Sequence, residues 1–314
     1  MFNASAFITE AVTAIQKQAR GRAVIAVSGG VDSTVAATLG ATALGKNLVA
    51  VHVDTGYMRK NEVETVTRLF QKIPLKFICV NASAIFYQAL KGIRDPEKKR
   101  KIIGEQFIRV FEDVARKEKA KYLIQGTIAP DWIESGDDLR DVIKSHHNVG
   151  GLPPDMELTL IEPLRDLYKD EVRKVARELQ LPVAEQQPFP GPGLAIRIIG
   201  EATPERTELV RDACFIVEDE IEHAAREKKM EFPWQYFAVL LPLKTVGVHG
   251  DLRAYGYTIA IRAVQSLDAM TASYSDIPHE VLERISIRIT NEHDNINRVV
   301  YDITNKPPGT VEWE

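Results

Sequence analysis

The chain has 314 residues, of which 45% are apolar and 27% charged, and its formal net charge is −4. This balance is typical of a globular protein of two domains and excludes a general attraction to nucleic acid or to anionic membranes. No apolar run approaches the roughly 20 residues of a membrane-spanning helix, and the N-terminus shows no secretory signal. The two cysteines, Cys79 and Cys214, lie in apolar segments, which predicts reduced, buried thiols in a cytoplasmic protein.

Strand-like and helical patterns alternate over the first 180 residues or so. Short apolar runs occur at 23–27, 48–53, 75–80, 121–125 and 157–161. Helical patterns occur at 5–18, 31–44, 61–72, 97–118 and 168–180. Continuous apolar strands between helices predict a doubly wound α/β domain, with a parallel sheet buried on both faces. Ligands of such a sheet bind at the carboxyl ends of its strands, so functional residues are expected in the loops that follow them.

A segment rich in proline and glycine, Pro182 to Gly193, predicts a domain boundary near residue 190, although a plain rigid linker has the same composition. Beyond it lie helical patterns at 204–227 and 278–291 and strand patterns at 235–241, 257–264 and 298–304. The sequence therefore predicts an α/β domain over residues 1–190 and a smaller α+β domain over residues 191–314.

The first strand is followed by the sequence S-G-G-V-D-S and then by a helical pattern. A tight glycine turn at a helix start presents backbone N–H groups that favour phosphate, although ordinary packing also explains such turns. No G-K-S/T follows, so the loop is not a Walker A loop. Asp32 inside an anion site favours a divalent cation such as Mg²⁺ that bridges its carboxylate to the phosphates. The candidate residues are Ser28, Gly29, Gly30, Val31, Asp32 and Ser33.

Two other strand ends carry candidate residues. Asp54 follows the second strand, where a carboxylate often meets a ribose, and the neighbouring Val53 backbone can equally contact an adenine edge. The sequence Asp54-Thr55-Gly56 is also a good turn, and the two interpretations stay open. Gly126 follows the fourth strand and is a further candidate for nucleotide binding. Asp131, a few residues later, is either a second magnesium ligand or a helix cap.

Two polar segments between the strands are candidates for binding anions. Arg94 precedes the basic helix start Lys98–Lys101 and can bind an anionic nucleotide through two parallel hydrogen bonds, whereas such a run of cations is otherwise a solvated face. Residues 137–153 contain Lys144 and end near a glycine pair, which is typical of a mobile lid or of an exposed loop. A lid lysine over the α-phosphate would neutralise charge that develops in the transition state.

The end of the chain reads K-P-P-G-T-V-E-W-E over residues 306–314. Tryptophan and two prolines in a terminal segment indicate that it is fixed to the rest of the protein. Lys306 can hold a phosphate, and Glu312 can accept hydrogen bonds from the N–H groups of a heterocyclic ring. A plain edge strand is the alternative for this segment.

Taken together, these segments closely resemble the ATP-pyrophosphatase part of the GMP synthetase family. The resemblance runs from Ser28 to Glu314 and is most specific in S-G-G-V-D-S, V-D-T-G-Y-M-R-K-N-E, I-K-S-H-H-N-V-G-G-L-P, P-F-P-G-P-G-L-A-I-R and the C-terminal segment. It implies that the C2 oxygen of XMP is adenylylated and that ammonia then displaces AMP to give GMP. It assigns the ATP phosphates and Mg²⁺ to residues 28–33. The XMP contacts that it implies are Arg94, Lys306, Glu312, Asp251 and Arg253.

The resemblance also implies which proteins this chain associates with. It makes the second domain a dimerisation module, and it implies that ammonia comes from solution or from a separate glutamine amidotransferase subunit, because this chain has no such domain. The family form differs from this sequence at His249, Leu252, Gly256 and Gln187. These departures concern the XMP contacts at Asp251 and Arg253.

We therefore expect an ATP- and magnesium-dependent ligase that aminates XMP, with Lys144 and Asp32 as catalytic residues and with neither nucleic acid nor membrane as a partner. A related pyrophosphatase that thiolates tRNA is one alternative, but sulfur transfer needs reactive thiolates. A nucleotide sensor without turnover is the other alternative. Such a sensor would need no lid lysine and would bind ATP without releasing pyrophosphate.

Overall fold

The computed structural model describes residues 2–129, 158–184, 186–249, 252–266 and 270–314. The chain forms two compact units. The first unit comprises Met1–Asp54, Asn61–Ala82 and Phe107–Gln186, and the second comprises Thr55–Lys60, Ser83–Gln106 and Gln187–Glu314. The helix α5 (Pro96–Lys117) contributes its first half to the second unit and its second half to the first. No helix in the described ranges is long and apolar enough to cross a membrane.

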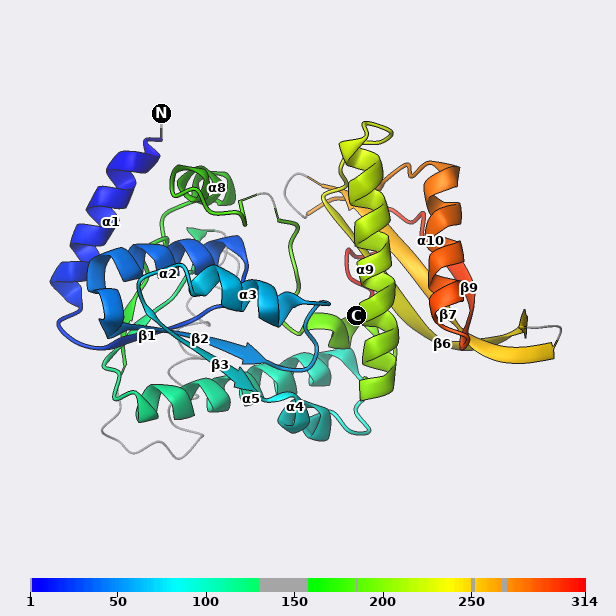
Figure 1. Ribbon diagram of the computed structural model, residues 1–314, viewed down its shortest axis with the longest axis horizontal. Helices are drawn as coiled ribbons and strands as arrows, with labels where there is room; N and C mark the ends of the chain where they lie inside the picture. Colours follow the sequence, from blue (N-terminus) through cyan, green and yellow to red (C-terminus); the bar gives the residue numbers. More distant parts are fainter. Residues whose placement is uncertain (1, 130–157, 185, 250–251, 267–269) are drawn as a thin grey trace. The chain divides into compact units, whose positions relative to one another are not determined.

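The first unit is built on a parallel sheet with the strand order β3-β2-β1-β4-β5 (Figure 1). Its strands are β1 (Ala23–Ala26), β2 (Leu48–Asp54), β3 (Lys76–Asn81), β4 (Tyr122–Ile124) and β5 (Thr159–Ile161). The predicted strands are confirmed, with ends that differ by at most two residues. The strand order reverses between β1 and β4, and ligands of open α/β sheets bind at the carboxyl ends of the strands beside such a reversal.

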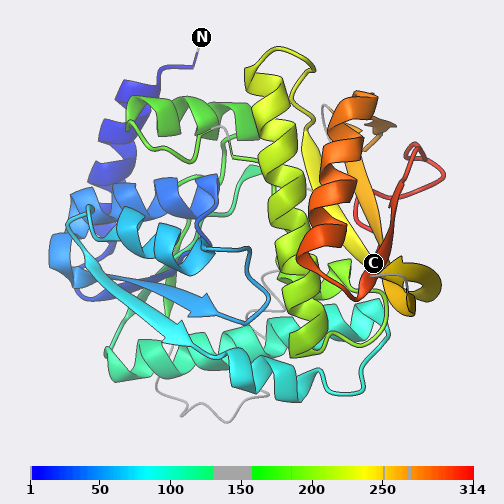
Figure 2. The same ribbon diagram turned by 45° about the vertical axis from the view of Figure 1, so that its right-hand side comes forward.

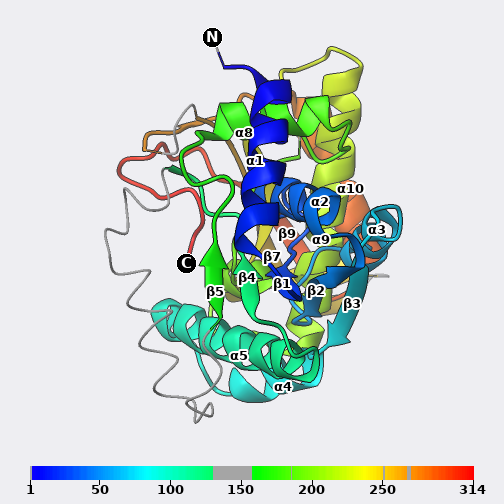
Figure 3. The same ribbon diagram turned by 90° about the vertical axis from the view of Figure 1, so that its left-hand side faces the viewer.

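Helices cover both faces of this sheet, as the doubly wound prediction requires (Figure 3). One face carries α1 (Ala4–Gln18), α2 (Val31–Leu44), α3 (Glu62–Phe70) and α8 (Lys169–Glu178), and a short 3-10 turn, η1 (Gly45–Asn47), follows α2. The second half of α5 covers the other face. The apolar core joins Ala23 and Ile25 of β1, and Val27 directly after it, to the helices of the first face. This alternation along β1 follows from the period of two in a strand.

The second unit contains a mixed sheet of four strands, with two long helices on one face (Figure 2). Its strands are β6 (Gln235–His249), β7 (Leu252–Gln265), β8 (Ser273–Tyr274) and β9 (Ile296–Tyr301). The helices of this face are α9 (Pro204–Arg226) and α10 (His279–Glu292). The unit also includes α4 (Ser83–Ala89), which sequence periodicity did not predict, and the 3-10 helix η2 (Gly193–Arg197). β7 pairs antiparallel with β6 and parallel with β9. The predicted α+β class is therefore correct.

The hairpin of β6 and β7 is longer than the sequence pattern predicts. The predicted strand 235–241 continues to His249, past a proline that lacks an N–H group. The pairing register shifts between Leu241 and Lys244, so Pro242 lies in a β-bulge, where a strand tolerates it. The prediction that this strand ends before Pro242 is therefore wrong.

A side-chain amide links the two strands of this hairpin near its distal end. Nδ2 of Asn297, on β9, donates to the carbonyl oxygens of Thr245 at 2.9 Å and Ala254 at 3.1 Å. A Cβ atom at Gly256 would lie 2.6 Å from Asn297 Cγ, and one at Gly247 would lie 2.5 Å away. Gly256, one of the departures from the family form, is thus required by the side chain packed against it.

An ion-pair cluster joins α9 to α10. Glu220 of α9 accepts hydrogen bonds from Arg284 Nε and Arg288 NH1, each at 2.7 Å, and Asp219 accepts from Arg288 at 2.6 Å. Burial by itself raises the pKa of Glu220, but the two arginines more than offset it, and the pKa lies below its ordinary value.

This depressed pKa predicts a pH-dependent contribution to stability. The contribution is present above the pKa of the unfolded chain and is lost as the pH falls through the lower pKa of the folded state. We expect Glu220→Gln to destabilise the protein by about 1–3 kcal/mol at pH 7. The difference in melting temperature from the wild type should shrink toward pH 3. Asp219→Asn, which removes a more exposed partner, should have a smaller effect, and a gap that is constant with pH would contradict this prediction.

Candidate functional site

The loop of residues 28–33 joins β1 to α2 at the carboxyl edge of the sheet. Gly30 is the N-cap of α2 and has no side chain to cap the first amides of the helix. Gly29 has φ +85°, and a Cβ atom there would lie 2.6 Å from Val66 Cγ2. Only glycine fits this position without displacing α3. The turn therefore leaves the amides at the start of α2 available to an anion.

Two hydroxyl groups hold this turn. Ser28 Oγ and Ser33 Oγ are 3.1 Å apart, and Ser33 Oγ also donates to the carbonyl oxygen of Gly30 at 3.1 Å. Gly30 N donates to Ser28 Oγ at 3.3 Å. The two serines thus close a ring of hydrogen bonds across the loop. Val31, the first residue of α2, is buried and anchors the helix start in the core.

Asp32 lies in the first turn of α2 and contacts a lysine from a distant segment. Its Oδ2 is 2.5 Å from Nζ of Lys169, the first residue of α8. Its Oδ1 is buried and has no hydrogen-bond partner in the part of the chain that the structure describes. Lys169 had no signal in the sequence beyond its place at a helix start. The loop without a Walker lysine therefore has a cation within reach, supplied from 137 residues further along the chain.

The end of β4 lies against this helix start. A Cβ atom at Gly126 would lie 3.1 Å from Asp32 C and O and 3.2 Å from Ser33 N. Gln125 Oε1 and Thr127 Oγ1 are buried and, within the described ranges, have no hydrogen-bond partner. Gly126 thus permits the segment after β4 to approach the loop of residues 28–33 closely. The residues directly before and after Gly126 each carry one of these unpaired polar atoms.

Val53 directs backbone polar groups toward the same edge. The carbonyl oxygen of Val51 accepts from Val27 N on the side of β1. Two residues later, Val53 directs its N–H and C=O groups to that side again, beyond the end of β1 at Ala26. Asp54 faces the other way, where its carbonyl oxygen accepts from Ala82 N at 2.9 Å. This geometry fits the expectation of an adenine contact at Val53.

Several predicted site residues lie outside the described residues. These are Lys144, Asp131, Asp251 and the whole expected lid at 137–153. Among the residues that the structure does describe, no cluster of three or more His, Cys, Asp or Glu side chains could hold a metal ion.

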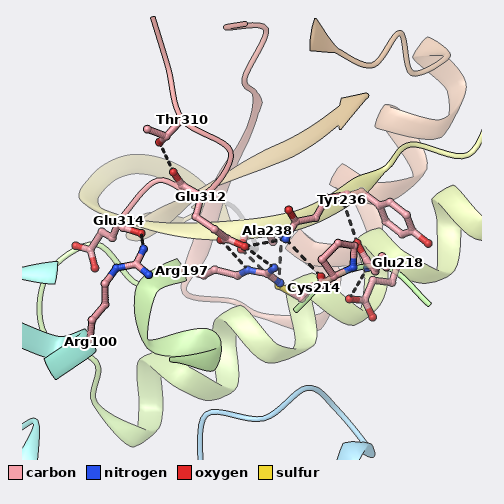
Figure 4. A network of polar contacts seen from close by, with 12 residues as sticks. Arg100, Arg197, Cys214, Glu218, Tyr236, Ala238, Thr310, Glu312 and Glu314 are labelled. Carbon is pink, nitrogen blue, oxygen red and sulfur yellow. Dashed lines mark hydrogen bonds and ion pairs between the residues drawn. The ribbon is translucent and has the colours of Figure 1, made fainter. Parts of the chain in front are cut away.

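The second unit assembles its candidate site around the terminal segment (Figure 4). Glu312 Oε1 accepts hydrogen bonds from Arg197 NH2 at 2.9 Å and from Gln235 Nε2 at 2.8 Å, and its Oε2 accepts from Arg197 Nε at 3.2 Å. Arg197 is 1% exposed. Sequence reasoning predicted a role for Glu312 but missed Arg197, because its signal is only a place beside a proline-glycine segment.

A second buried cation holds the last residue. Lys99, which is 0% exposed, donates to the carbonyl oxygens of Ala195 at 3.0 Å and Ile198 at 2.7 Å and forms an ion pair with Glu314. Arg100 bonds the carbonyl oxygen of Glu314. Burial lowers the pKa of Lys99 and raises that of Glu314, and their mutual attraction offsets only part of both shifts.

The remaining predicted contacts of the second unit are dispersed. Arg94 is exposed in the loop before α5, five residues from Lys99. Lys306 exchanges two backbone hydrogen bonds with Ala272, and Arg253 is exposed near the start of β7. Gln187, which stands where the family often has histidine, links β6 to α9 through Tyr236 N and Glu218 Oε1, each at 3.0 Å.

The sheet and its glycine turn define the chain as an α/β synthetase of the ATP-pyrophosphatase class. The family model described as NAD synthase matches residues 3–127, and that described as GMP synthase C terminal domain matches residues 219–313. Among solved structures, NMN synthetase from Francisella tularensis aligns with a TM-score of 0.48 and 16% identity, over 62% of this chain and 78% of that one.

Relatives of known name match the whole chain. The B-type subunit of GMP synthase (glutamine-hydrolyzing) from Thermoplasma acidophilum is 56% identical, over 99% of this chain and 99% of the relative. Its counterpart from Thermococcus kodakarensis is 57% identical, over 98% and 99%, and that from Methanopyrus kandleri is 54% identical over the full length of both. The chain belongs to this family of GMP synthase subunits.

The turn at Gly29 yields a stability prediction. Gly29→Ala forces a side chain into a left-handed backbone position and into contact with Val66, and we expect a loss of about 1–3 kcal/mol in the free energy of unfolding. Gly30→Ala is the matched control. Gly30 has φ −74°, and a Cβ atom there would meet only Ser28 Oγ at 3.4 Å. Equal melting temperatures for the two variants would show that the turn is not constrained at Gly29.

Proposed function

We propose that this chain catalyses the ATP-dependent amination of XMP to GMP through an adenylyl-XMP intermediate, with ammonia from a separate glutaminase subunit. Full-length identity above 50% to proteins named as a subunit of glutamine-hydrolyzing GMP synthase is the observation that carries the proposal. In the first step the XMP C2 oxygen attacks the α-phosphorus of ATP and pyrophosphate leaves. In the second step ammonia attacks C2, and AMP departs with that oxygen.

The loop supports the first step because it can hold the two phosphates that leave. Ser28 and Ser33 supply hydroxyls, and Gly29, Gly30 and Val31 supply backbone at the start of α2. Asp32 fits a magnesium ion, because its buried Oδ1 has no partner among the described residues and Mg²⁺ binds carboxylate and phosphate oxygens together. When bound, the ion would neutralise phosphate charge. Asp131 would be its second carboxylate ligand.

Lysines complete the site in this proposal. Lys169 contacts Asp32, and because its side chain is 46% exposed, it would also be able to reach the outer phosphates. Lys144, from the lid, would stabilise the charge that develops on the α-phosphoryl group. Val53 and Gly126 would contact the adenine and the ribose side of the nucleotide, at the edge where the strand order reverses between β1 and β4.

The second unit would bind XMP. Arg94 and Lys306 would pair with its phosphate, and Glu312, fixed by Arg197, would accept from a ring N–H group. Asp251 and Arg253 are further candidate contacts. Each of these assignments rests on the chemistry of the side chain and on the family resemblance.

Partners and location complete the proposal. The relatives are named as one subunit of a glutamine-hydrolyzing enzyme, which supports a separate glutamine amidotransferase subunit. We also propose a homodimer formed through the second unit, and a location in the cytoplasm. Free thiols at Cys79 and Cys214 fit such a reducing compartment.

The raised pKa values of the two cysteine thiols argue against tRNA thiolation as the function. Burial raises the pKa of Cys214 to about 11. Cys79 is exposed, so the prediction of two buried thiols is wrong for this residue. Partial desolvation, with the nearby Asp54 and Glu64 carboxylates, nevertheless raises the pKa of Cys79 as well. Neither thiol is therefore activated as a thiolate at neutral pH.

Product analysis tests the proposed reaction. With XMP, ATP, Mg²⁺ and ammonium, we expect GMP, AMP and pyrophosphate in equal amounts, and glutamine should not replace ammonium for the isolated chain. Omission of XMP, or its replacement by UMP or uncharged tRNA, should stop pyrophosphate release. ADP with orthophosphate as products would overturn the assignment, and activity on glutamine alone would refute the separate glutaminase.

Two variants test the nucleotide site. Asp32→Asn should abolish turnover, because an amide is a poorer magnesium ligand than a carboxylate. Lys169→Met should raise KM for ATP about 10- to 100-fold, the value of one charge-assisted hydrogen bond. Lys174→Met on the same helix is the control, since its ammonium pairs with Asp170 at 3.0 Å. Wild-type kinetics in both site variants would remove these residues from the mechanism.

A further inference from the structure

We propose that Arg197 is a positioning residue for purine recognition: it fixes the Glu312 carboxylate so that one acceptor site remains open for one ring N–H group. This inference deepens the proposed function and rests on it. It concerns a residue that would not itself touch the substrate.

The first observation is the burial of the guanidinium. Arg197 ends η2 and is 1% exposed, and a buried cation without a counter-charge is costly. Its side chain donates two parallel hydrogen bonds to Glu312. Burial by itself lowers the pKa of Arg197, but the Glu312 carboxylate more than offsets it, so the pKa is raised. Arg197 therefore stays charged and paired.

The second observation is that aromatic rings restrict this guanidinium. Its Cζ atom lies 4.1 Å from the ring centroid of Phe237 and 5.2 Å from that of Phe189. NH1 also lies 4.0 Å from Cys214 Sγ. A buried planar guanidinium packed against two rings has few other orientations, so it sets the direction of the carboxylate that it binds.

The third observation is the count of acceptor sites on Glu312. A carboxylate offers about four lone-pair sites, two on each oxygen. Oε1 accepts from Arg197 and Gln235, which uses both of its sites, whereas Oε2 accepts, among the residues that the structure describes, from Arg197 alone. The Glu312 side chain is 15% exposed, so its carboxylate is not sealed off from solvent. A carboxylate with one open site suits one N–H donor of the purine ring.

The other cations of the tail make different contacts. Arg262, which is fully buried, donates to the carbonyl oxygens of Thr304 and Thr310 and pairs with Asp302. Lys99 pairs with Glu314. These residues hold the tail in place, whereas Arg197 and Gln235 bond the Glu312 carboxylate itself. The simpler alternative is that Glu312 serves only as the counter-ion of Arg197.

A double-mutant cycle separates the two interpretations. The variants are Arg197→Lys, Glu312→Gln and the pair together, in the full chain, with calorimetric XMP binding, KM and kcat for XMP, and KM for ATP as readouts. We expect each single variant to raise KM and Kd for XMP about 10- to 100-fold, with kcat and the KM for ATP changed less than about threefold. Arg197→Lys should add nothing further in the Glu312→Gln background.

A substrate analogue gives a second readout. N1-methyl-XMP lacks one ring N–H donor, and a site built to bond that group rejects such an analogue strongly. We expect the wild type to prefer XMP to this analogue, and both single variants to lose most of that preference. A merely structural Arg197 would leave the preference intact.

Controls keep the test decisive if Arg197→Lys folds poorly. Gln235→Leu removes the other donor to Glu312 and should raise KM for XMP by about threefold to tenfold, again only when Glu312 is present. Arg262 contacts carbonyl oxygens of the tail and not the Glu312 carboxylate. Arg262→Lys should therefore lower the melting temperature, but it should reduce the preference for XMP over N1-methyl-XMP less than Arg197→Lys does.

The outcomes distinguish this inference from the proposed function. If the wild type makes GMP but Glu312→Gln binds XMP normally, or if the effects of Arg197→Lys and Glu312→Gln simply add, the inference is wrong and the function stands. If the wild type neither binds XMP nor forms GMP, both are wrong.

Discussion

One backbone position decides whether the first unit can bind an anion. Gly29 bends the chain with a positive φ directly behind β1, where a side chain would strike Val66. Because the bend is so tight, α2 begins at the carboxyl edge of the sheet, where its N-cap residue Gly30 has no side chain to cap its first amides. Every other feature of this edge depends on that turn, including the ring of serine hydroxyls, Asp32 and the close approach of Gly126.

In the second unit, the central constraint is how the terminal segment is held in place. This segment has few regular backbone pairs, and buried cations hold it instead. Three cations that are almost or fully inaccessible to solvent contact this tail: Lys99, Arg197 and Arg262. Lys99 pairs with Glu314, Arg197 pairs with Glu312, and Arg262 donates to the carbonyl oxygen of Thr310. Removing one partner of such a pair leaves a buried charge, which is why these pairs make one conformation of the tail much more favourable than others. Placement of Glu312 is thus a consequence of how the unit is stabilised.

Local patterns predicted most of the fold. Apolar runs and helical periodicity located the five parallel strands and the long helices, because burial on both faces leaves a clear signal. Pro242 misled the prediction of β6, since a bulge is a tertiary feature. The short helix α4 was missed. Composition also gives no sign that residues 55–60 and 83–106 belong to the second unit, because that membership depends on contacts distant in sequence.

The site was predictable only where a motif is contiguous. The residues of S-G-G-V-D-S were found from their spacing, whereas Lys169 and Arg197 come from segments 137 and 115 residues away from their partners. The lysine at a helix start carries no local mark of function, and Arg197 stood out only as the last residue of the motif P-F-P-G-P-G-L-A-I-R. Their chemistry arises from the groups they meet after folding.

The amide of Asn297 has a consequence for how this protein can change over generations. It bonds both strands of the β6–β7 hairpin just before its distal end, so the alignment of the two strands is fixed at that level. Insertions or deletions at the distal end can therefore accumulate without a slip that would turn the inner face of the sheet outward. The hairpin tip is a place where relatives can diverge in length while the sheet below keeps its pairing.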